Sequence, residues 1–180
     1  MEKILVIGGG GYVGTELISY LIKKNNYIYC VDKFIYEKNS FIKNSKKVNI
    51  LKYDITHSSF YNNIPADISS VIILAGLVGD PITKKYPKLS HQINFLAIKK
   101  IVNFYKKLKV KLIFVSTCSN YGFLENKIAN EKTSLNPKSL YAKQKVKIEK
   151  YILSLRKKSK FTPTILRFST AFGVSARPRF

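Results

Sequence analysis

The chain has 180 residues, 46% of them hydrophobic, and a formal net charge of +22. This is the length of one domain, or of one domain with part of another, and the hydrophobic content excludes a disordered chain. The sequence lacks a long apolar run, a signal-peptide pattern before Ile4 and a metal-binding or disulfide pattern around Cys30 and Cys118, which predicts a cytoplasmic protein that neither holds a metal nor contacts a membrane.

Short β-branched runs alternate along the chain with segments whose apolar residues recur every three or four positions. The runs predict strands buried on both faces, and the periodic segments predict helices. This alternation predicts right-handed βαβ connections and an α/β fold, a doubly wound parallel sheet with helices on both faces. In chain order we expect a strand at 4–7, a helix at 12–24, strands at 27–31, 47–52 and 70–74, a helix at 91–108, a strand at 112–115, a helix at 141–155 and a strand at 164–168. The loop at 121–138 is longer than most connections, which predicts a functional role.

A glycine-rich turn joins the first expected strand to the first expected helix. Gly8, Gly11 and Gly14 have the spacing of a dinucleotide-binding fingerprint. In such a turn the first glycine allows a tight bend, the second lets a pyrophosphate approach the backbone, and the third lets helix and strand pack closely. The N–H groups and positive dipole of the helix start, at Tyr12 and Val13, complete an anion site. A glycine turn without a ligand is the alternative, but the flanking strand and helix favour a dinucleotide.

Asp32 closes the second expected strand, 18 residues after Gly14. A carboxylate at this position accepts hydrogen bonds from the ribose hydroxyls of an adenosine and repels a 2′-phosphate, which favours NAD over NADP. Lys33, directly beside it, would soften that repulsion. An ordinary surface aspartate is the alternative, and the matching spacing argues against it.

Tyr141 and Lys145 lie four residues apart on one face of an expected helix, after a segment rich in serine and threonine. A phenol that removes a proton from a substrate hydroxyl near neutral pH needs its pKa of about 10 lowered by about 3 units, worth about 4 kcal/mol. One ammonium at about 4 Å and an effective dielectric of about 20 supplies about that much. Thr117 or Ser116 has the hydroxyl to hold the substrate oxygen as a carbonyl forms.

With these residues in chain order, the sequence resembles the extended short-chain dehydrogenase/reductases, in their nucleotide-sugar epimerase/dehydratase branch. The resemblance runs from Lys3 to Phe180. It implies a Rossmann-type sheet with NAD as cofactor, and it makes residues 1–180 the NAD-binding domain of a longer protein whose substrate lobe is missing. The positions that match the branch for cofactor binding are Gly8, Gly11, Tyr12, Val13, Gly14, Asp32, Lys33, the adenine-contacting pair Asp54 and Ile55, then Leu74, Ala75, Gly76, Tyr141 and Lys145. Further matches are Thr117, Glu149 and the stretches 166–168 and 172–173.

The resemblance implies transient oxidation of a sugar carbinol by bound NAD. Tyr141 would take the hydroxyl proton, Lys145 would lower the pKa of Tyr141 and hold the nicotinamide ribose, and Thr117 would steady the oxygen. Dehydratases of this branch carry Asp-Glu directly after the threonine, whereas Cys118 and Ser119 follow it here. This argues against dehydration and leaves an epimerase or a reductase of a nucleotide-sugar. For the full-length form, a homodimer is one expectation.

Two alternatives stay open. The first is an NAD-binding remnant without catalytic activity, which the abrupt end at Phe180 favours. The second is a basic nucleic-acid-binding module, suggested by the net charge. Against the second, lysines spread along the chain carry most of the charge. Arginine, which forks onto phosphates and bases, occurs only as Arg156, Arg167, Arg177 and Arg179. We therefore expect a nucleotide-sugar as partner and no nucleic acid. A nucleophilic role for Cys118 is not expected, because neither His57 nor His91 lies in a protease-like pattern.

Overall fold

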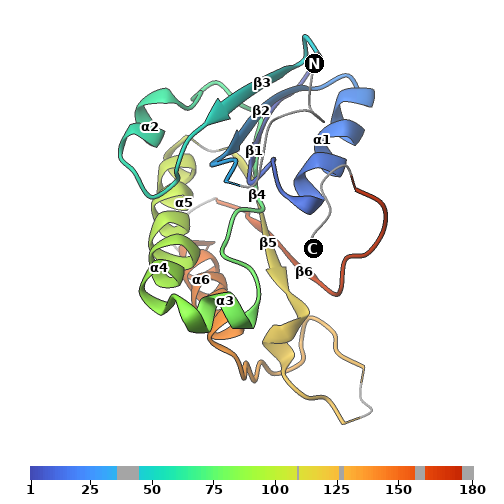
Figure 1. Ribbon diagram of the computed structural model, residues 1–180, viewed down its shortest axis with the longest axis vertical. Helices are drawn as coiled ribbons and strands as arrows, with labels where there is room; N and C mark the ends of the chain where they lie inside the picture. Colours follow the sequence, from blue (N-terminus) through green and yellow to red (C-terminus); the bar gives the residue numbers. More distant parts are fainter. Residues whose placement is uncertain (36–44, 109, 126–127, 157–160, 176–180) are drawn as a thin grey trace.

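Six parallel strands form a sheet in the computed structural model, which describes residues 1–35, 45–108, 110–125, 128–156 and 161–175. The strands are β1 (Lys3–Ile7), β2 (Tyr27–Asp32), β3 (Val48–Lys52), β4 (Ser70–Ile73), β5 (Lys111–Thr117) and β6 (Thr164–Phe168). Their order is β3-β2-β1-β4-β5-β6, and every neighbouring pair is parallel. This is the order of a doubly wound sheet (Figure 1), so the predicted fold class is confirmed.

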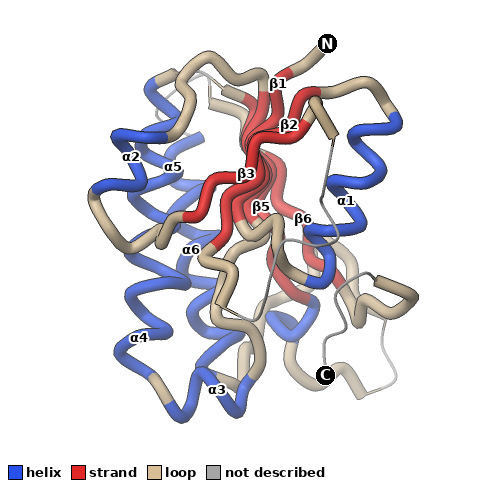
Figure 2. Tube along the Cα trace, turned by 45° about the horizontal axis from the view of Figure 1, so that its top comes forward, coloured by secondary structure: helices blue, strands red, loops and turns tan. Residues whose placement is uncertain are grey.

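Helices cover both faces of the sheet, as Figure 2 shows. α1 (Tyr12–Lys23) lies on one face, and α2 (Ser59–Asn63), α5 (Ile98–Lys107) and α6 (Leu140–Arg156) lie on the other. The described residues also contain α3 (Asp80–Lys85), α4 (Pro87–His91), a π-helical segment at Gln92–Ala97 and a 3-10 turn at Cys118–Tyr121.

The central strand β1 contributes apolar side chains to both faces. Ile4 and Val6 join the core beneath α1, whereas Leu5 and Ile7 join the larger core that includes residues of α5 and α6. Successive side chains of a strand point to opposite faces, so a strand covered on both sides needs a continuous apolar run. This is the physical reason why β1 is uninterrupted by polar residues between Ile4 and Ile7.

All the strands expected from the sequence are present, and most of their ends agree to within one or two residues. The expected helix at 91–108 differs: it begins earlier, as α4, and passes through the π-helical segment before α5. The sequence analysis does not predict α2 and α3, because five or six residues are too few to show helical periodicity. Pro81 and Pro87, in the first turns of α3 and α4, are the local signals for those helix starts.

The carboxyl ends of the strands meet at one edge of the sheet because all the strands are parallel. The segments at that edge are 8–14 after β1, 33–35 after β2, 53–56 after β3, 74–79 after β4 and 118–122 after β5. The strand order reverses between β1 and β4, and doubly wound folds bind ligands at such a point. Within the described ranges, none of the helices combines the length and apolar content that crossing a membrane requires.

Candidate functional site

The glycine turn after β1 packs closely against β2 and the segment after β4. Gly8 has a φ of 90°, and its N–H donates to the carbonyl of Val31 at 2.7 Å. A Cβ on Gly8 would lie 2.5 Å from the amide nitrogen of Ala75, and a Cβ on Gly14 would lie 2.4 Å from the carbonyl oxygen of Gly8. Gly8 and Gly14 are therefore required by the packing of the protein itself, as the fingerprint predicts for its first and third glycines.

Gly11 behaves differently from the other two glycines. It is the N-cap residue of α1, and the nearest atom to a Cβ placed on it, the Gly8 carbonyl oxygen, would lie 3.3 Å away. No side chain caps α1, and its first turn has no acidic residue. Tyr12 and Val13 thus open a helix whose N-terminal dipole has no counter-charge from this turn, and a pyrophosphate fits that environment. The glycine turn fits a dinucleotide.

Asp32 faces the glycine turn. Its carboxylate accepts the N–H of Gly10 at 3.0 Å on one oxygen and the N–H of Phe34 at 2.9 Å on the other. Asp32 thereby joins the end of β2 to the turn after β1, where a ribose carboxylate is expected. Phe34 is not predicted from the sequence; its φ is 49° and its ring lies against Gly10. A positive φ on a bulky residue is uncommon and cannot be read from composition.

Lys33 points to Asp54 and not to its neighbour Asp32. The Nζ of Lys33 lies 2.8 Å from an Asp54 carboxylate oxygen, and the other oxygen of Asp54 accepts the N–H of Thr56 at 2.9 Å and its hydroxyl at 2.7 Å. Burial acts to raise the pKa of Asp54, but the hydrogen bonds from Lys33 and Thr56 outweigh it and lower that pKa to about 2. Asp54 is therefore ionised at neutral pH, and Lys33 is its ion-pair partner.

The remaining residues predicted to bind the cofactor lie either in the hydrophobic core or at the carboxyl edge of the sheet. The Ile55 side chain is buried in the core beneath α5, so only its backbone is at the edge of the sheet. The N–H groups of Leu74 and Ala75 both donate to the Ile7 carbonyl, at 2.8 and 2.9 Å, which holds the segment after β4 against β1. Gly76 follows them, and a Cβ there would lie 3.9 Å from the Nζ of Lys145. The fold thus brings the segment predicted to bind the cofactor next to Lys145.

Tyr141 and Lys145 lie on the first turns of α6, as predicted. Lys145 is buried, its Nζ donates to the Val115 carbonyl at 2.9 Å, and it lies 5.8 Å from the centroid of the Tyr141 ring and 4.6 Å from that of Phe114. Burial lowers the pKa of Lys145 to about 8, and the charge of Glu149 acts in the opposite direction. The ammonium is thus still the main form at pH 7, and it lies beside the Tyr141 ring.

Thr117 is the last residue of β5 and the N-cap of the following 3-10 turn. Its hydroxyl oxygen accepts the Ser119 N–H at 3.2 Å and lies 3.2 Å from the Ser119 hydroxyl. Ser116, the other candidate, is buried and accepts a hydrogen bond from Asn120 at 3.0 Å. Since neighbouring strand residues point to opposite faces, only Thr117 of this pair is available to a substrate.

A buried polar network supports the Thr117 turn, and the sequence analysis recognises only part of it. Glu149 of α6 accepts from the Arg167 guanidinium of β6 at 2.8 Å and from the Asn120 amide at 2.7 Å. Arg167 also donates to the Tyr121 hydroxyl at 2.9 Å. Glu149 and the stretch around Arg167 match the family pattern, but no periodicity in the sequence shows that they pair with each other and with Asn120.

The π-helical segment before α5 holds the loop after β4. The Asn94 carboxamide accepts the Leu77 N–H at 2.8 Å and donates to the Leu77 carbonyl at 3.0 Å. Its nitrogen also contacts Gln144 of α6 at 3.0 Å, and Gln144 accepts from the Ser90 hydroxyl. π-Helical turns are frequent at functional sites. Here the turn carries an asparagine that connects α6 to the loop beside Gly76, a contact that no motif in the sequence indicates.

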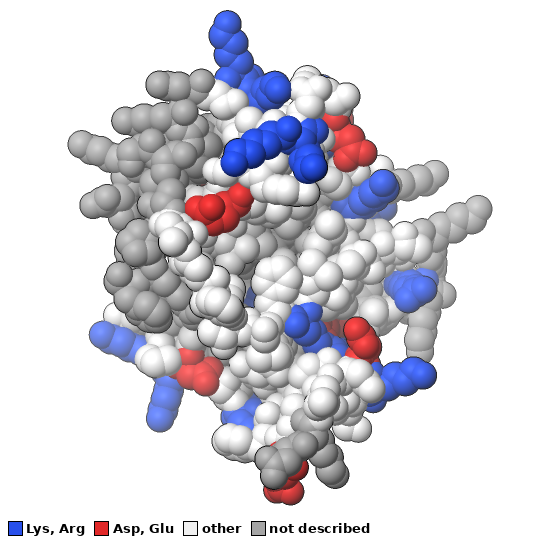
Figure 3. Space-filling view, turned by 90° about the vertical axis from the view of Figure 1, so that its right-hand side faces the viewer, with Lys and Arg blue, Asp and Glu red and all other residues white. Residues whose placement is uncertain are grey.

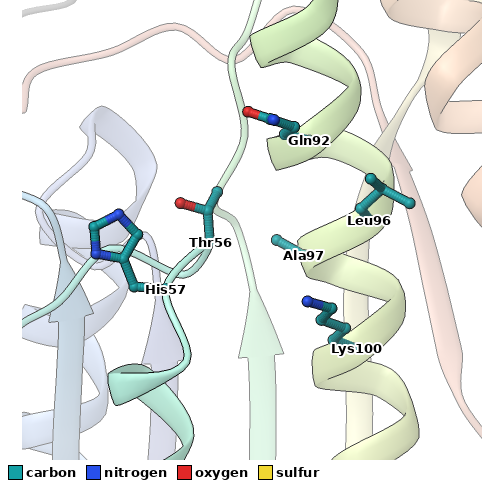
Figure 4. Close-up of a pocket in the computed structure, with 6 residues that line it drawn as sticks. All are labelled: Thr56, His57, Gln92, Leu96, Ala97 and Lys100. Carbon is teal, nitrogen blue, oxygen red and sulfur yellow. The ribbon is translucent and has the colours of Figure 1, made fainter.

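A pocket of about 380 Å³ lies beyond Asp54, between the β3–α2 loop and the helix that runs through the π-helical segment into α5 (Figure 4). Thr56 and His57 approach it from the loop, and Gln92, Leu96, Ala97 and Lys100 approach it from the helix. Thr56 is shared with the hydrogen bonds of Asp54. None of the residues predicted to bind the cofactor lines this pocket.

The basic side chains do not form one continuous patch on the face that carries α1. Figure 3 shows lysine and arginine side chains there in separate small groups, with acidic side chains between them. A nucleic-acid-binding surface ordinarily shows a basic stripe or patch, so the described residues of this face give the nucleic-acid alternative no support.

Known proteins resemble the chain along nearly its whole length. UDP-glucose 4-epimerase of Lactobacillus helveticus is 27% identical, over 97% of this chain and 53% of that protein. dTDP-D-glucose 4,6-dehydratase of Dictyostelium discoideum is 31% identical, over 99% of this chain and 46% of that protein. The structure of UDP-glucuronic acid 4-epimerase from Bacillus cereus in complex with NAD superposes with a TM-score of 0.85 at 24% identity, over 99% of this chain and 59% of that one. The chain thus spans about half the length of these relatives.

The match to a family model agrees with the geometry of the site. It covers residues 4–180, from the first strand to the last residue of the chain, and so includes the glycine turn, Asp32, Thr117 and the Tyr141–Lys145 pair. The chain belongs to the NAD-dependent epimerase/dehydratase family.

Proposed function

We propose that the chain is the NAD-binding part of a nucleotide-sugar epimerase. The observation that carries the proposal is the position of Lys145: it is buried at the end of β5, next to Gly76 and on the same helix face as Tyr141. The glycine turn and the start of α1 lie at the same edge of the sheet. A dinucleotide held by that turn and a sugar hydroxyl at Tyr141 would therefore meet at one place.

Each proposed catalytic residue has a role that its surroundings support. Tyr141 takes the proton of the sugar hydroxyl, and the Lys145 ammonium lowers the pKa of the phenol by its positive charge. The Thr117 hydroxyl donates to the substrate oxygen as it becomes a carbonyl. Bound NAD supplies the hydride acceptor, and Gly8, Gly11, Gly14, Asp32 and Asp54 are the residues we propose to hold it. Return of the hydride to the other face of the ketone gives the epimer.

The residues after Thr117 support epimerisation over dehydration. Cys118 is exposed, and the Ser119 N–H donates to the Thr117 hydroxyl oxygen. Elimination of water from a sugar needs an acid and a base beside the reacting carbons. Cys118 and Ser119 have no carboxyl group that could serve as either. A reductase of a nucleotide-sugar would use the same proton-transfer residues and stays the alternative reaction.

We also propose a cytoplasmic location, supported by the two free thiols Cys30 and Cys118.

A chain that binds NAD without turning over a sugar is the second candidate. Leu166 and Phe168 of β6 are each 38% exposed, and Phe172, which follows β6, is 90% exposed. Because these apolar side chains are exposed, no described part of the protein encloses this region, whereas a substrate site has to exclude water. The homodimer expected for a full-length form stays a prediction.

Product analysis separates the two candidates. Purified chain and a full-length form are incubated with NAD and a panel of UDP-, GDP- and dTDP-sugars, and the products are resolved by chromatography. Epimer formation by the full-length form, lost in Tyr141→Phe, is the expected result. Sugars that stay unchanged under conditions where NAD is bound would instead support the NAD-binding remnant. Steady conversion by the 180-residue chain itself, at about 1–1000 per second, would contradict that second candidate.

A further inference from the structure

Lys33 directly follows the proposed ribose carboxylate but has its ammonium elsewhere. Its Nζ lies 2.8 Å from an Asp54 carboxylate oxygen, and among the described residues no ion pair joins Lys33 to Asp32. Both oxygens of Asp32 instead accept backbone N–H groups, from Gly10 and Phe34. The nearest cation in the sequence is therefore paired with Asp54 and not with Asp32.

The fold explains why Asp54 captures this lysine. β2 and β3 are neighbours, and the Tyr53 N–H donates to the Asp32 carbonyl at 3.1 Å, which brings the segment after β3 beside the end of β2. Asp54 is held there by both hydrogen bonds from Thr56 and is only 19% exposed, whereas the Lys33 side chain is 60% exposed. The Asp54 carboxylate is thus held in place by its neighbours, and the more exposed Lys33 side chain extends to meet it.

We propose that Asp54 determines the choice between NAD and NADP by holding Lys33 away from Asp32. A 2′-phosphate placed at Asp32 meets a carboxylate that forms an ion pair with none of the described lysines or arginines, while the ribose hydroxyls of NAD need no cation. A lysine ammonium is an effective phosphate partner when it is free. Asp54 is thus a positioning residue for cofactor selection, acting through Lys33 at a distance from the ribose.

Asp54 can serve the adenine at the same time. An ionised carboxylate offers about four lone-pair sites. Lys33 and the two groups of Thr56 use three of them, which leaves one for the exocyclic amine of an adenine. Because NAD and NADP share that amine, loss of this contact weakens both dinucleotides alike, whereas release of Lys33 helps only the one with a 2′-phosphate.

The test measures the ratio of the NADP and NAD dissociation constants by calorimetry on the 180-residue chain. Asp54→Asn keeps the shape of the side chain and removes the charge that holds Lys33. We expect this ratio to fall by about fivefold, the size of one exposed charge pair, and the fall to shrink as salt is added. Lys33→Gln alone should leave the ratio unchanged within about twofold, because Lys33 is already occupied. In the double variant the effect of Asp54→Asn should disappear.

Asp67→Asn is the matched control. Asp67 pairs with Lys3 in another exposed ion pair, at the opposite end of β1, so its loss changes the net charge equally and should leave the ratio unchanged. NMR titration with AMP and adenosine 2′,5′-bisphosphate gives the same ratio for smaller ligands, so weak binding by Asp54→Asn still yields a result. An unchanged ratio in Asp54→Asn, or an equal fall when Lys33 is absent, would overturn the inference.

The inference rests on the proposal that Asp32 binds the ribose, and the Asp32→Ala variant tests that proposal separately. If Asp32→Ala leaves the ratio unchanged, the ribose assignment is wrong. If Asp32→Ala lowers the ratio and Asp54→Asn does not, the assignment stands and the role of Asp54 is wrong.

Discussion

The two halves of the site are built by different kinds of interaction. On the β1–β3 side, backbone N–H groups make most of the contacts: those of Gly8 and Gly10 donate to Val31 and Asp32. The ion pair at this end of the sheet, Lys33–Asp54, is largely exposed at its lysine. On the β5–β6 side, buried side chains connect distant elements. Lys145 of α6 donates to β5, and Glu149 of α6 joins Arg167 of β6.

This difference has an energetic consequence. Exposed ion pairs contribute about 0–1 kcal/mol, whereas removal of one partner from a buried pair costs about 3–5 kcal/mol because the other charge is left uncompensated. Changes of charge on the β1–β3 side should therefore shift ligand preference, whereas changes on the β5–β6 side should lower turnover or stability.

Tyr141→Phe in a full-length form is expected to lower turnover by about a hundred- to ten-thousandfold, the usual contribution of a general acid–base. NAD binding should stay close to that of the unchanged protein, because the phenylalanine ring keeps the packing. Steady-state rates with the accepted sugar and calorimetry with NAD measure the two effects. Near-normal turnover in this variant would mean that another group is the base.

Arg167→Met is expected to destabilise the chain by about 3–5 kcal/mol, because Glu149 would stay buried with Asn120 as its main partner. Urea unfolding of the 180-residue chain measures the free energy of unfolding. The exposed ion pair between Lys3 and Asp67 supplies the control: Asp67→Asn, which breaks that contact, should leave the free energy of unfolding nearly unchanged. Equal costs for the two variants would remove the distinction between the halves.

The burial of Lys145 predicts a pH dependence of stability. Its folded pKa of about 8 is below the ordinary lysine pKa of 10.5, so between these two pH values the unfolded chain binds more protons than the folded chain. Stability from this group therefore rises as the pH goes up through 8 toward 10.5, by about 2 kcal/mol from pH 7.5 to 9.5, and is lost as the pH falls. Unfolding free energies measured across this range should show a weaker rise in Lys145→Met. A parallel slope in the two proteins would show that the ammonium is not buried in solution.

Asp32→Ala is expected to narrow the preference for NAD over NADP by about tenfold, the value of a hydrogen bond to a charged group together with the lost repulsion. Calorimetry with both dinucleotides measures it. The unchanged chain should bind NAD more tightly than NADP, and preference for NADP in that protein would contradict the role of Asp32. Lys23→Gln, at the far end of α1 from the glycine turn, serves as a control for a general change of charge.

Local geometry explains why the candidate site residues could be predicted from the sequence. Glycine spacing, the carboxylate at the end of a strand and the Tyr141–Lys145 separation each depend on residues close together in the chain, whose geometry is set by one turn or one helix. The same local rules predict the parallel sheet from alternating apolar runs.

The pairings between distant segments were decided only by the tertiary structure. Lys33 could pair with Asp32, its neighbour in the sequence, or with Asp54, which follows β3. Because β3 lies beside β2 in the sheet, Lys33 pairs with Asp54. Ser116 and Thr117 are equivalent by composition, and the twofold alternation of β5 together with Asn120 turns Ser116 into the core. Such choices depend on which elements pack side by side, because a side chain finds its partner by proximity in space and not by separation in sequence.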